Sequence, residues 1–205
     1  GFLPGYNFPR LPIRAFVSTR VDRGEYLSRV RSLALTEYGP GNVVYHEGRK
    51  YRVVRTYPPA GGLDELFTEA KVCRECGVFC SEQQISVDVC PHCGVKLDGD
   101  TSEYLTSLFR MATVGTQRAE RINCEEEERV KQGYETSAHY QFATDNGVER
   151  RMPATSSGVN GNALLELEYG PTAKILRVNR RWRRSSTPGF FLDMTTGYWG
   201  EKEVD

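Results

Sequence analysis

The chain has 205 residues, of which 39% are hydrophobic and 26% charged, and its 27 lysines and arginines balance its 27 aspartates and glutamates. This composition allows a buried core and excludes wholesale disorder. The neutral total excludes a global electrostatic argument for nucleic-acid binding, so only local clusters of charge can be argued. No apolar run approaches the roughly 18 residues of a membrane span.

The first 68 residues are expected to form an extended segment and a β-hairpin. Residues 1–20 are punctuated by proline and end in a short β-rich run, and residues 21–37 have the loose apolar spacing of a short helix. Two β-rich runs then meet at Glu47-Gly48. A two-residue turn ending in glycine suits a tight hairpin, because glycine adopts positive φ at little cost.

Residues 69–100 contain five of the six cysteines and are expected to form a zinc-ribbon-like knob. Four of them make two CxxC pairs that are 13 residues apart and are each followed by glycine; these are Cys73, Cys76, Cys90 and Cys93. Such pairs form knuckles whose thiolates suit Zn²⁺ in a tetrahedron, with bonds of about 2.3 Å. Two disulfides, an iron–sulfur cluster or redox-active pairs are the alternatives. The redox alternative requires a thioredoxin-like context that this segment lacks.

Zinc held by four thiolates has no open coordination position, so the predicted site is structural and has no activated water. Cys80 is expected to be a free thiol beside an apolar wall near Phe79, although it could replace a ligand. His92 lies inside the second knuckle and is expected to be exposed, without a specific role. Cys124 is isolated, and the default interpretation is a core cysteine. Paired CxxC motifs without signs of secretion favour a reducing compartment, and we expect a cytoplasmic protein.

Residues 101–205 are expected to be strand-rich and to pack on residues 1–68, so that the chain is one composite α+β domain with the knob inserted. Residues 103–117 read as one strand, and a strand pair is expected around Asp145-Asn146-Gly147. Two further strands are expected on either side of Gly170-Pro171. The acidic run Glu125–Glu128 is interpreted as the first turn of a short helix, where acids favour the positive end of the helix dipole.

Arginines concentrate near the C-terminus, around one tryptophan. The candidate nucleic-acid-binding residues are Arg177, Arg180, Arg181, Trp182, Arg183 and Arg184. Arginine binds phosphate with two parallel hydrogen bonds, and tryptophan can stack on a base. The alternative is a solvated strand whose arginines pair with nearby acids and whose tryptophan anchors the strand in the core. His46 and His139 lie in alternating strand patterns and are interpreted as structural.

The sequence has no motif that nominates a catalytic site. It lacks the P-loop pattern of ATPases, and it lacks GxSxG, HExxH and GxGxxG. We therefore predict no catalytic residues in this chain.

Several phrases in one order resemble the C-terminal region of large bacterial superfamily 2 DNA helicases. They are GFLPGYNFP, LALTEYGPGNVVYHEGRKYRV, the paired CxxC segment, RINCEEEERVKQGYE, YGPTAKILRVNRRWRR and GFFLDMTTGYW. The resemblance covers nearly the whole chain and extends to MrfA-like repair helicases and, more closely, to the DrmA-like helicases of DISARM phage defence. It implies that the chain is a piece of an ATP-dependent helicase whose motor domains precede Gly1. It also associates zinc with the four paired cysteines.

The expected function is a zinc-binding accessory region that makes sequence-independent contacts with the DNA backbone, in phage defence or DNA repair. Its expected partners are DNA, the motor domains of the same polypeptide and a subunit of a defence or repair system. The alternative is a protein-interaction module without DNA contact of its own, which would use the zinc knob and exposed aromatic side chains. These side chains are Phe190, Phe191, Tyr198 and Trp199.

Overall fold

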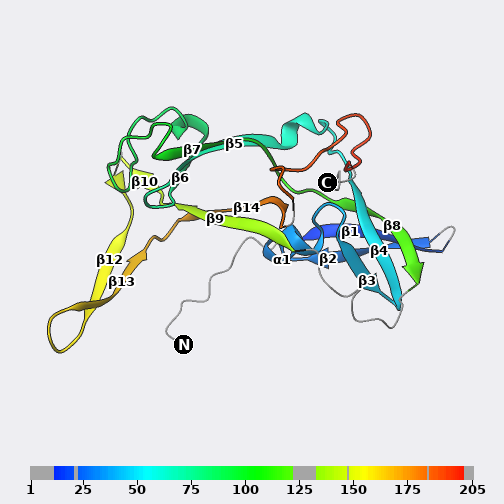
Figure 1. The fold of residues 1–205 in the computed structure, drawn as a ribbon, viewed down its shortest axis with the longest axis horizontal. Helices are drawn as coiled ribbons and strands as arrows, with labels where there is room; N and C mark the ends of the chain where they lie inside the picture. Colours follow the sequence, from blue (N-terminus) through cyan, green and yellow to red (C-terminus); the bar gives the residue numbers. More distant parts are fainter. Residues whose placement is uncertain (1–11, 21–22, 122–132, 147, 184, 201–205) are drawn as a thin grey trace. The chain divides into compact units, whose positions relative to one another are not determined.

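A computed structural model describes residues 12–20, 23–121, 133–146, 148–183 and 185–200 (Figure 1). Within these ranges the chain is rich in strands and has a single α-helix, which confirms the expected strand-rich α+β class. Cys124 and the acidic run Glu125–Glu128 lie outside the described residues, so the predictions made for them stay predictions.

Strands follow one another along the described residues with only three short helical elements between them. In chain order the elements are β1 (Ile13–Arg20), β2 (Arg23–Arg29), α1 (Arg31–Glu37), β3 (Val43–His46), β4 (Arg49–Thr56), the 3-10 helix η1 (Asp64–Leu66), β5 (Phe67–Cys73), β6 (Phe79–Ser81), the 3-10 helix η2 (Glu82–Gln84), β7 (Ser102–Phe109), β8 (Val114–Arg121), β9 (Tyr134–Gln141), β10 (Thr144–Asp145), β11 (Val148–Glu149), β12 (Met152–Ser157), β13 (Ala163–Tyr169) and β14 (Lys174–Trp182).

The chain divides into two compact units, each made of separate segments. The first comprises Gly1–Phe67, Phe109–Ser137 and Val178–Asp205, and the second comprises Thr68–Leu108 and Ala138–Arg177. The first unit's first segment ends at Phe67, one residue before residue 68, where the sequence analysis ends the segment that precedes the cysteines. Residues 101–205 are shared between the two units.

The first unit contains a five-stranded sheet in the order β2-β1-β8-β4-β3. Strands β1 and β8 are parallel, and the other neighbours are antiparallel. The predicted hairpin is confirmed as β3 and β4, which join at Glu47 (φ +46°) and Gly48 (φ +69°). Two successive positive φ values are those of the tight turn whose twist matches the flanking strands.

One face of this sheet carries the core of the first unit. Alternate residues of each strand point to the same side, so Ile13, Ala15 and Val17 of β1 enter the core together. Tyr51 of β4 is fully buried among them, and Tyr38 is buried at the end of α1. The Tyr38 hydroxyl donates to the Leu27 carbonyl at 3.0 Å, so the buried ring keeps a partner for its polar end.

The helix expected within residues 21–37 is only half as long, because residues 23–29 form β2. This strand pairs with β1 over its whole length, with Ala15 opposite Leu27. The apolar spacing that suggested a helix therefore serves a strand, since burial of Leu27 against the core outweighs local helix propensity. The Asn42 side-chain amide donates to the Glu37 carbonyl at 2.8 Å and so satisfies one of the last carbonyls of α1.

The single strand predicted over residues 103–117 is wrong, because the segment forms β7 and β8, which belong to different sheets. The residues between the two strands bond elsewhere. Arg110 N–H donates to the Leu66 carbonyl at 2.7 Å, and Tyr57 N–H donates to the Thr113 carbonyl at 2.8 Å. Once these backbone groups are committed, one continuous strand is not possible.

The second unit contains the three-stranded sheet β6-β5-β7 and two hairpins. The turn predicted at Asp145-Asn146-Gly147 is confirmed, with Asp145 opposite Val148, but its strands β10 and β11 have only two residues each. Residues 152–157 pair instead with β13. All residues of β12 and β13 are exposed, and Figure 1 shows this hairpin (yellow) extending away from β10 of the same unit. Strands β9 and β14 form a two-stranded sheet.

Candidate metal centre

The two CxxC pairs form turns with the same backbone hydrogen bonding. In the first turn, Cys73 N–H donates to the Val78 carbonyl at 2.8 Å, and Gly77 N–H donates back to the Cys73 carbonyl at 2.9 Å. The second turn repeats both bonds at Cys90 and Gly94, at 2.8 and 3.0 Å. The glycines have φ of +79° and +75°, as the knuckle interpretation predicts, because an L side chain at this φ is strained.

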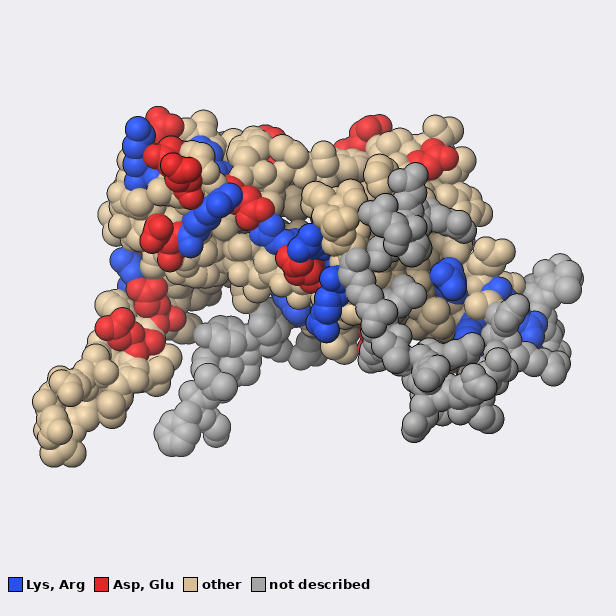
Figure 2. All heavy atoms as spheres, in the orientation of Figure 1, with Lys and Arg blue, Asp and Glu red and all other residues tan. Residues whose placement is uncertain are grey.

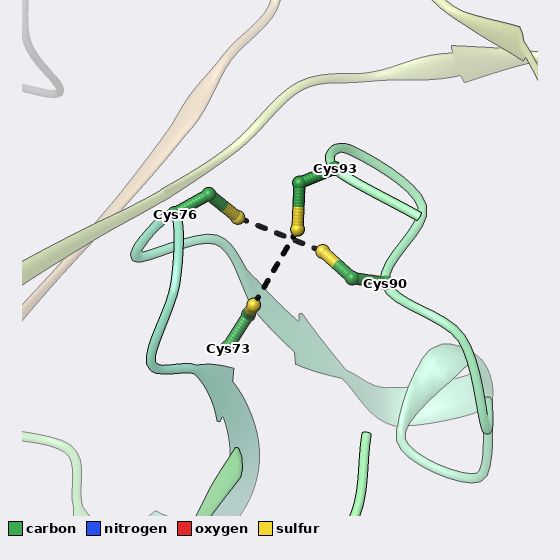
Figure 3. A group of neighbouring side chains, drawn as sticks. All are labelled: Cys73, Cys76, Cys90 and Cys93. Carbon is green, nitrogen blue, oxygen red and sulfur yellow. Dashed lines mark hydrogen bonds between the residues drawn. The ribbon is translucent and has the colours of Figure 1, made fainter. Parts of the chain in front are cut away.

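The four sulfur atoms of these turns converge on one centre (Figure 3). The Sγ atoms of Cys73 and Cys93 are 3.7 Å apart, and those of Cys76 and Cys90 are 3.6 Å apart. All four Sγ atoms lie within 4.8 Å of one another. In a tetrahedron with metal–sulfur bonds of about 2.3 Å, the edge between two sulfurs is about 3.8 Å. The residues therefore fit a tetrahedral metal ion held by four thiolates.

The disulfide alternative does not describe this arrangement. All four cysteines are free thiols. Their sulfurs are separated across the two knuckles by far more than the roughly 2.05 Å of a disulfide bond.

The thiols differ in their surroundings. Burial raises the pKa of Cys76 and of Cys90, because a thiolate loses hydration in the protein interior. Cys93 is exposed, and the Val95 backbone N–H lowers its pKa by donating to the sulfur. Two of the four thiols are thus held in the neutral form until a cation offsets the cost of charging them.

A small apolar cluster surrounds the sulfurs. Val78 and Leu97 are buried in it with Cys73 and Cys90, and the Tyr140 ring packs against it. Burial raises the pKa of Tyr140 to about 12. A knob with so few buried residues gains little from hydrophobic burial alone, so a bound metal would supply much of its folding free energy.

The expectation that His92 is exposed and has no specific role is wrong. Its side chain is only 12% exposed, and its Nδ1 lies 2.9 Å from Glu149 Oε2, while Nε2 lies 3.5 Å from Glu168 Oε2. The ring also packs edge-on against Tyr140 and is stacked with Phe142. His92 thus connects the second knuckle to β11 and β13. The sequence offered no signal for this, because the partners lie 57 and more residues away.

Cys80 does not belong to the four-sulfur group. It lies on β6 opposite Lys71 of β5, it is 1% exposed, and burial raises its pKa to about 11. Its neighbour Phe79 packs in a separate apolar cluster with Ala70 and Val72. This placement is that of the buried, free thiol that the sequence suggested.

The candidate nucleic-acid-binding residues lie on β14 and just after it, and Arg184 lies outside the described residues. Arg181 Nε donates to Glu135 Oε2 at 2.8 Å, and Arg180 Nε donates to Ser137 Oγ at 2.8 Å. Arg177 and Arg183 are exposed. Arg181 therefore pairs with an acid of β9, as in the alternative interpretation, whereas the contact of Arg180 on β9 is with a serine.

Trp182 is packed against aromatic rings of the first unit. Its ring stacks on Tyr134 with centroids 4.5 Å apart, and Phe190 contacts both rings. Trp199 contacts Phe190 in turn. Phe190 and Trp199 are therefore partly buried, which corrects the expectation that they are exposed, whereas Phe191 is 72% exposed.

A second group of ligand-type side chains lies in the first unit. Glu25, His46 and Glu47 place their ligand atoms within 4.8 Å of one another, and these side chains are exposed or partly exposed. His46 contacts Glu25. No pattern in the sequence indicates this partner, because Glu25 and His46 lie on strands that do not pair.

Comparison with protein-family models, with curated proteins and with solved structures finds no match for this chain. Among the helices of the described residues, none is long and apolar enough to cross a membrane.

Proposed function

We propose that this chain is a metal-stabilised accessory region that contacts DNA and has no catalytic site of its own. The observation that carries the metal-stabilised part of the proposal is the convergence of four cysteine thiols on one centre. A closed four-thiolate site has no position for substrate or water, so its contribution is to fasten two segments of chain.

We propose zinc as the ion. The sulfur separations of 3.6 and 3.7 Å suit a tetrahedral ion, and four sulfur donors favour Zn²⁺ or iron over hard cations. Bound zinc would stabilise the thiolates and would have a structural role only. Cys73 and Cys76 would then be held to Cys90 and Cys93, and the two knuckles would form one rigid knob.

The proposed DNA contact lies on β14. Arg177 and Arg183 are exposed and are suited to phosphate oxygens, while Arg180 and Arg181 are oriented by their contacts with β9. Contacts of this kind are independent of base sequence and sensitive to salt. The resemblance to superfamily 2 helicases supplies the setting: an ATP-dependent motor in the same polypeptide, acting in phage defence or DNA repair.

The metal part of the proposal is tested by metal content. The purified chain is subjected to elemental analysis, with Cys90→Ser and Cys80→Ser as matched variants. About one zinc per chain is expected, lost in Cys90→Ser and retained in Cys80→Ser. Retention of zinc by Cys90→Ser, or its loss from Cys80→Ser, would overturn the ligand assignment, and one iron per chain would replace zinc.

The DNA part is tested by fluorescence anisotropy with a labelled duplex over a range of salt concentrations. The double variant Arg177→Ala, Arg183→Ala should bind more weakly than the natural chain, and the slope of log affinity against log salt should fall by about 0.9 for each phosphate that the variant no longer neutralises. Arg110→Ala is the matched control, because Arg110 is an exposed arginine outside β14. Absence of binding at low salt would reject the DNA contact.

A second candidate function is a protein-interaction module, and the β12–β13 hairpin favours it. Leu164 is 72% exposed, Leu167 is 57% exposed and Met152 is 60% exposed. Apolar side chains gathered on one exposed hairpin are typical of surfaces that a partner covers. The DNA titration distinguishes the two candidate functions, because a protein-interaction module is not expected to show salt-dependent binding to DNA.

A further inference from the structure

The five-stranded sheet of the first unit has a second face, opposite its core, which we call the outer sheet face. Because Ala15 and Val17 enter the core, Arg14 and Phe16 point to the other side. The strand registers extend this face. Phe16 lies opposite Tyr26 on β2 and opposite Gly115 on β8.

The alternation of side chains also shows which residues of β4 point to the outer sheet face. Tyr51 and Val53 are buried, so Arg52 between them belongs to the outer sheet face, where it lies opposite Gln117 of β8 and Val43 of β3. An irregularity in register follows Val53 and turns Arg55 to the outer face as well. A side chain added at Gly115 would meet the Arg55 Cγ atom at 2.8 Å.

Arginines recur on the outer sheet face. Among the strand residues whose side chains the structure describes, Arg14, Arg52 and Arg55 point to this face, and none of those that do so is an aspartate or glutamate. The ion pairs of the described residues involve none of Arg14, Arg52 and Arg55. On a chain whose net charge is zero, this is a local concentration of positive charge, whereas Figure 2 shows acidic and basic side chains interspersed over the left part of the view. Such a face attracts anions.

Aromatic rings lie among these cations. Phe16 and Tyr26 have ring centroids 5.2 Å apart, and the Tyr26 side chain is 57% exposed. The Phe16 ring covers Gly24, where an added Cβ would lie 2.2 Å from the ring. The missing side chain at Gly24 therefore lets Phe16 lie close over the strand. Tyr26 is left presenting its ring to solvent beside Arg14 and Phe16.

The guanidinium of Arg55 is held by rings rather than by acids. It lies 4.3 Å from the centroid of the Tyr57 ring and 5.4 Å from that of Tyr198. Its buried Nε has no hydrogen-bond partner among the described residues. A cation oriented by aromatic faces keeps its charge available to a ligand.

We propose that the outer sheet face binds single-stranded nucleic acid. The arginines would contact successive phosphates, and bases would stack on Tyr26 and its neighbours. A sheet face with cations around exposed rings suits a single strand, because bases in a duplex are stacked on one another and cannot reach a ring. The proposal rests on the DNA role proposed above and deepens it by naming the form of nucleic acid, but it uses no residue of β14.

The test is the affinity of the whole chain for a fluorescein-labelled oligothymidylate of about 16 nucleotides, a length typical of such sites. Tyr26→Ala is expected to weaken binding about tenfold, the size of one base stack, and Tyr26→Phe should retain it. Arg52→Ala should weaken binding and reduce the salt slope by about 0.7. Arg118→Ala is the matched control, because Arg118 is exposed on β8 opposite Tyr51, on the core side of the sheet. Far-ultraviolet circular dichroism checks that each variant is folded.

Each outcome decides between the surfaces. Loss of single-strand binding in Tyr26→Ala and Arg52→Ala but not in Arg118→Ala supports the proposal. Equal loss in Arg118→Ala, or no loss in Tyr26→Ala, overturns it. If only the β14 variant loses DNA binding, the proposed function stands and this inference fails. If poly-glutamate displaces the oligothymidylate and binds as tightly, the face is a general anion surface and the proposal is also wrong.

Discussion

His46 Nε2 contacts Glu25 Oε1, although β3 and β2 are the two opposite edges of the five-stranded sheet. The sheet is therefore curled so strongly that its edges approach each other. The curl places the core on the concave side, with Tyr51 and Val53 buried, and leaves the outer sheet face on the convex side. Twisted strands that close toward a barrel behave in this way.

Removal of the His46–Glu25 ion pair should cost little stability. The Glu25 and His46 side chains are 46% and 23% exposed, and solvent screens an ion pair in this setting. Glu25→Gln is expected to lower the free energy of unfolding by less than about 1 kcal/mol in a urea titration. Tyr51→Ala, which empties part of the core, should lower it by about 3 kcal/mol or more. A larger decrease in Glu25→Gln than in Tyr51→Ala would mean that the ion pair, not the core, closes the sheet.

Metal affinity should fall steeply as the pH is lowered. Burial raises the pKa of Cys76 and Cys90, so without metal both thiols are protonated near neutral pH, and metal binding must release at least these two protons. The affinity for Zn²⁺ should then drop by at least about 100-fold for each pH unit between about pH 8 and pH 6. Competition with a chromophoric chelator measures it. A change of tenfold or less per pH unit would contradict the thiolate assignment.

Cys80 should resist alkylation in the folded protein. Only the thiolate reacts, and Cys80 is buried with its pKa raised to about 11. Because the folded-state pKa lies above that of an unfolded thiol, Cys80 contributes stability at pH below about 9, which is lost as the pH rises through about 11. Iodoacetamide at pH 8 should leave Cys80 unmodified in native protein and modify it in urea, as mass spectrometry of peptides would show. Equal modification in both conditions would disprove its burial.

Two glycines of the first unit should respond differently to alanine. Gly197 has φ +74°, and an added Cβ would lie 2.4 Å from the Thr56 carbonyl oxygen. Its own carbonyl accepts from Thr56 N–H at 2.8 Å, so the backbone cannot move away without breaking that bond. Gly48 has φ +69° with open space around it.

Gly48→Ala should therefore cost about 1–2 kcal/mol, the strain of a left-handed residue, and Gly197→Ala clearly more. Thermal unfolding of the two variants measures the difference. Equal destabilisation would show that the close approach to Thr56 is relieved without cost.

Local features of this chain could be predicted because they depend on residues close together in the sequence. The knuckle turns bond Cys73 to Val78, five residues away, and glycine at the required position is visible in the sequence. The β3–β4 hairpin follows from Glu47-Gly48 in the same way. The predicted helix and the predicted strand over residues 103–117 were wrong in part, because partners distant in the sequence decided between strand and helix, and between one strand and two.

The sequence by itself determined which four cysteines form the candidate metal centre, and that four thiolate ligands would leave no open coordination position. Spacing within each pair sets the turn, and the chemistry of sulfur sets the ligand class. Only the tertiary structure decided what surrounds these features. It placed His92 between Glu149 and Glu168, brought Glu25 to His46, and put Arg14, Arg52, Arg55 and Tyr26 on one face of the sheet. Strand register and burial make these contacts, and a shift of one residue would turn every side chain to the other face.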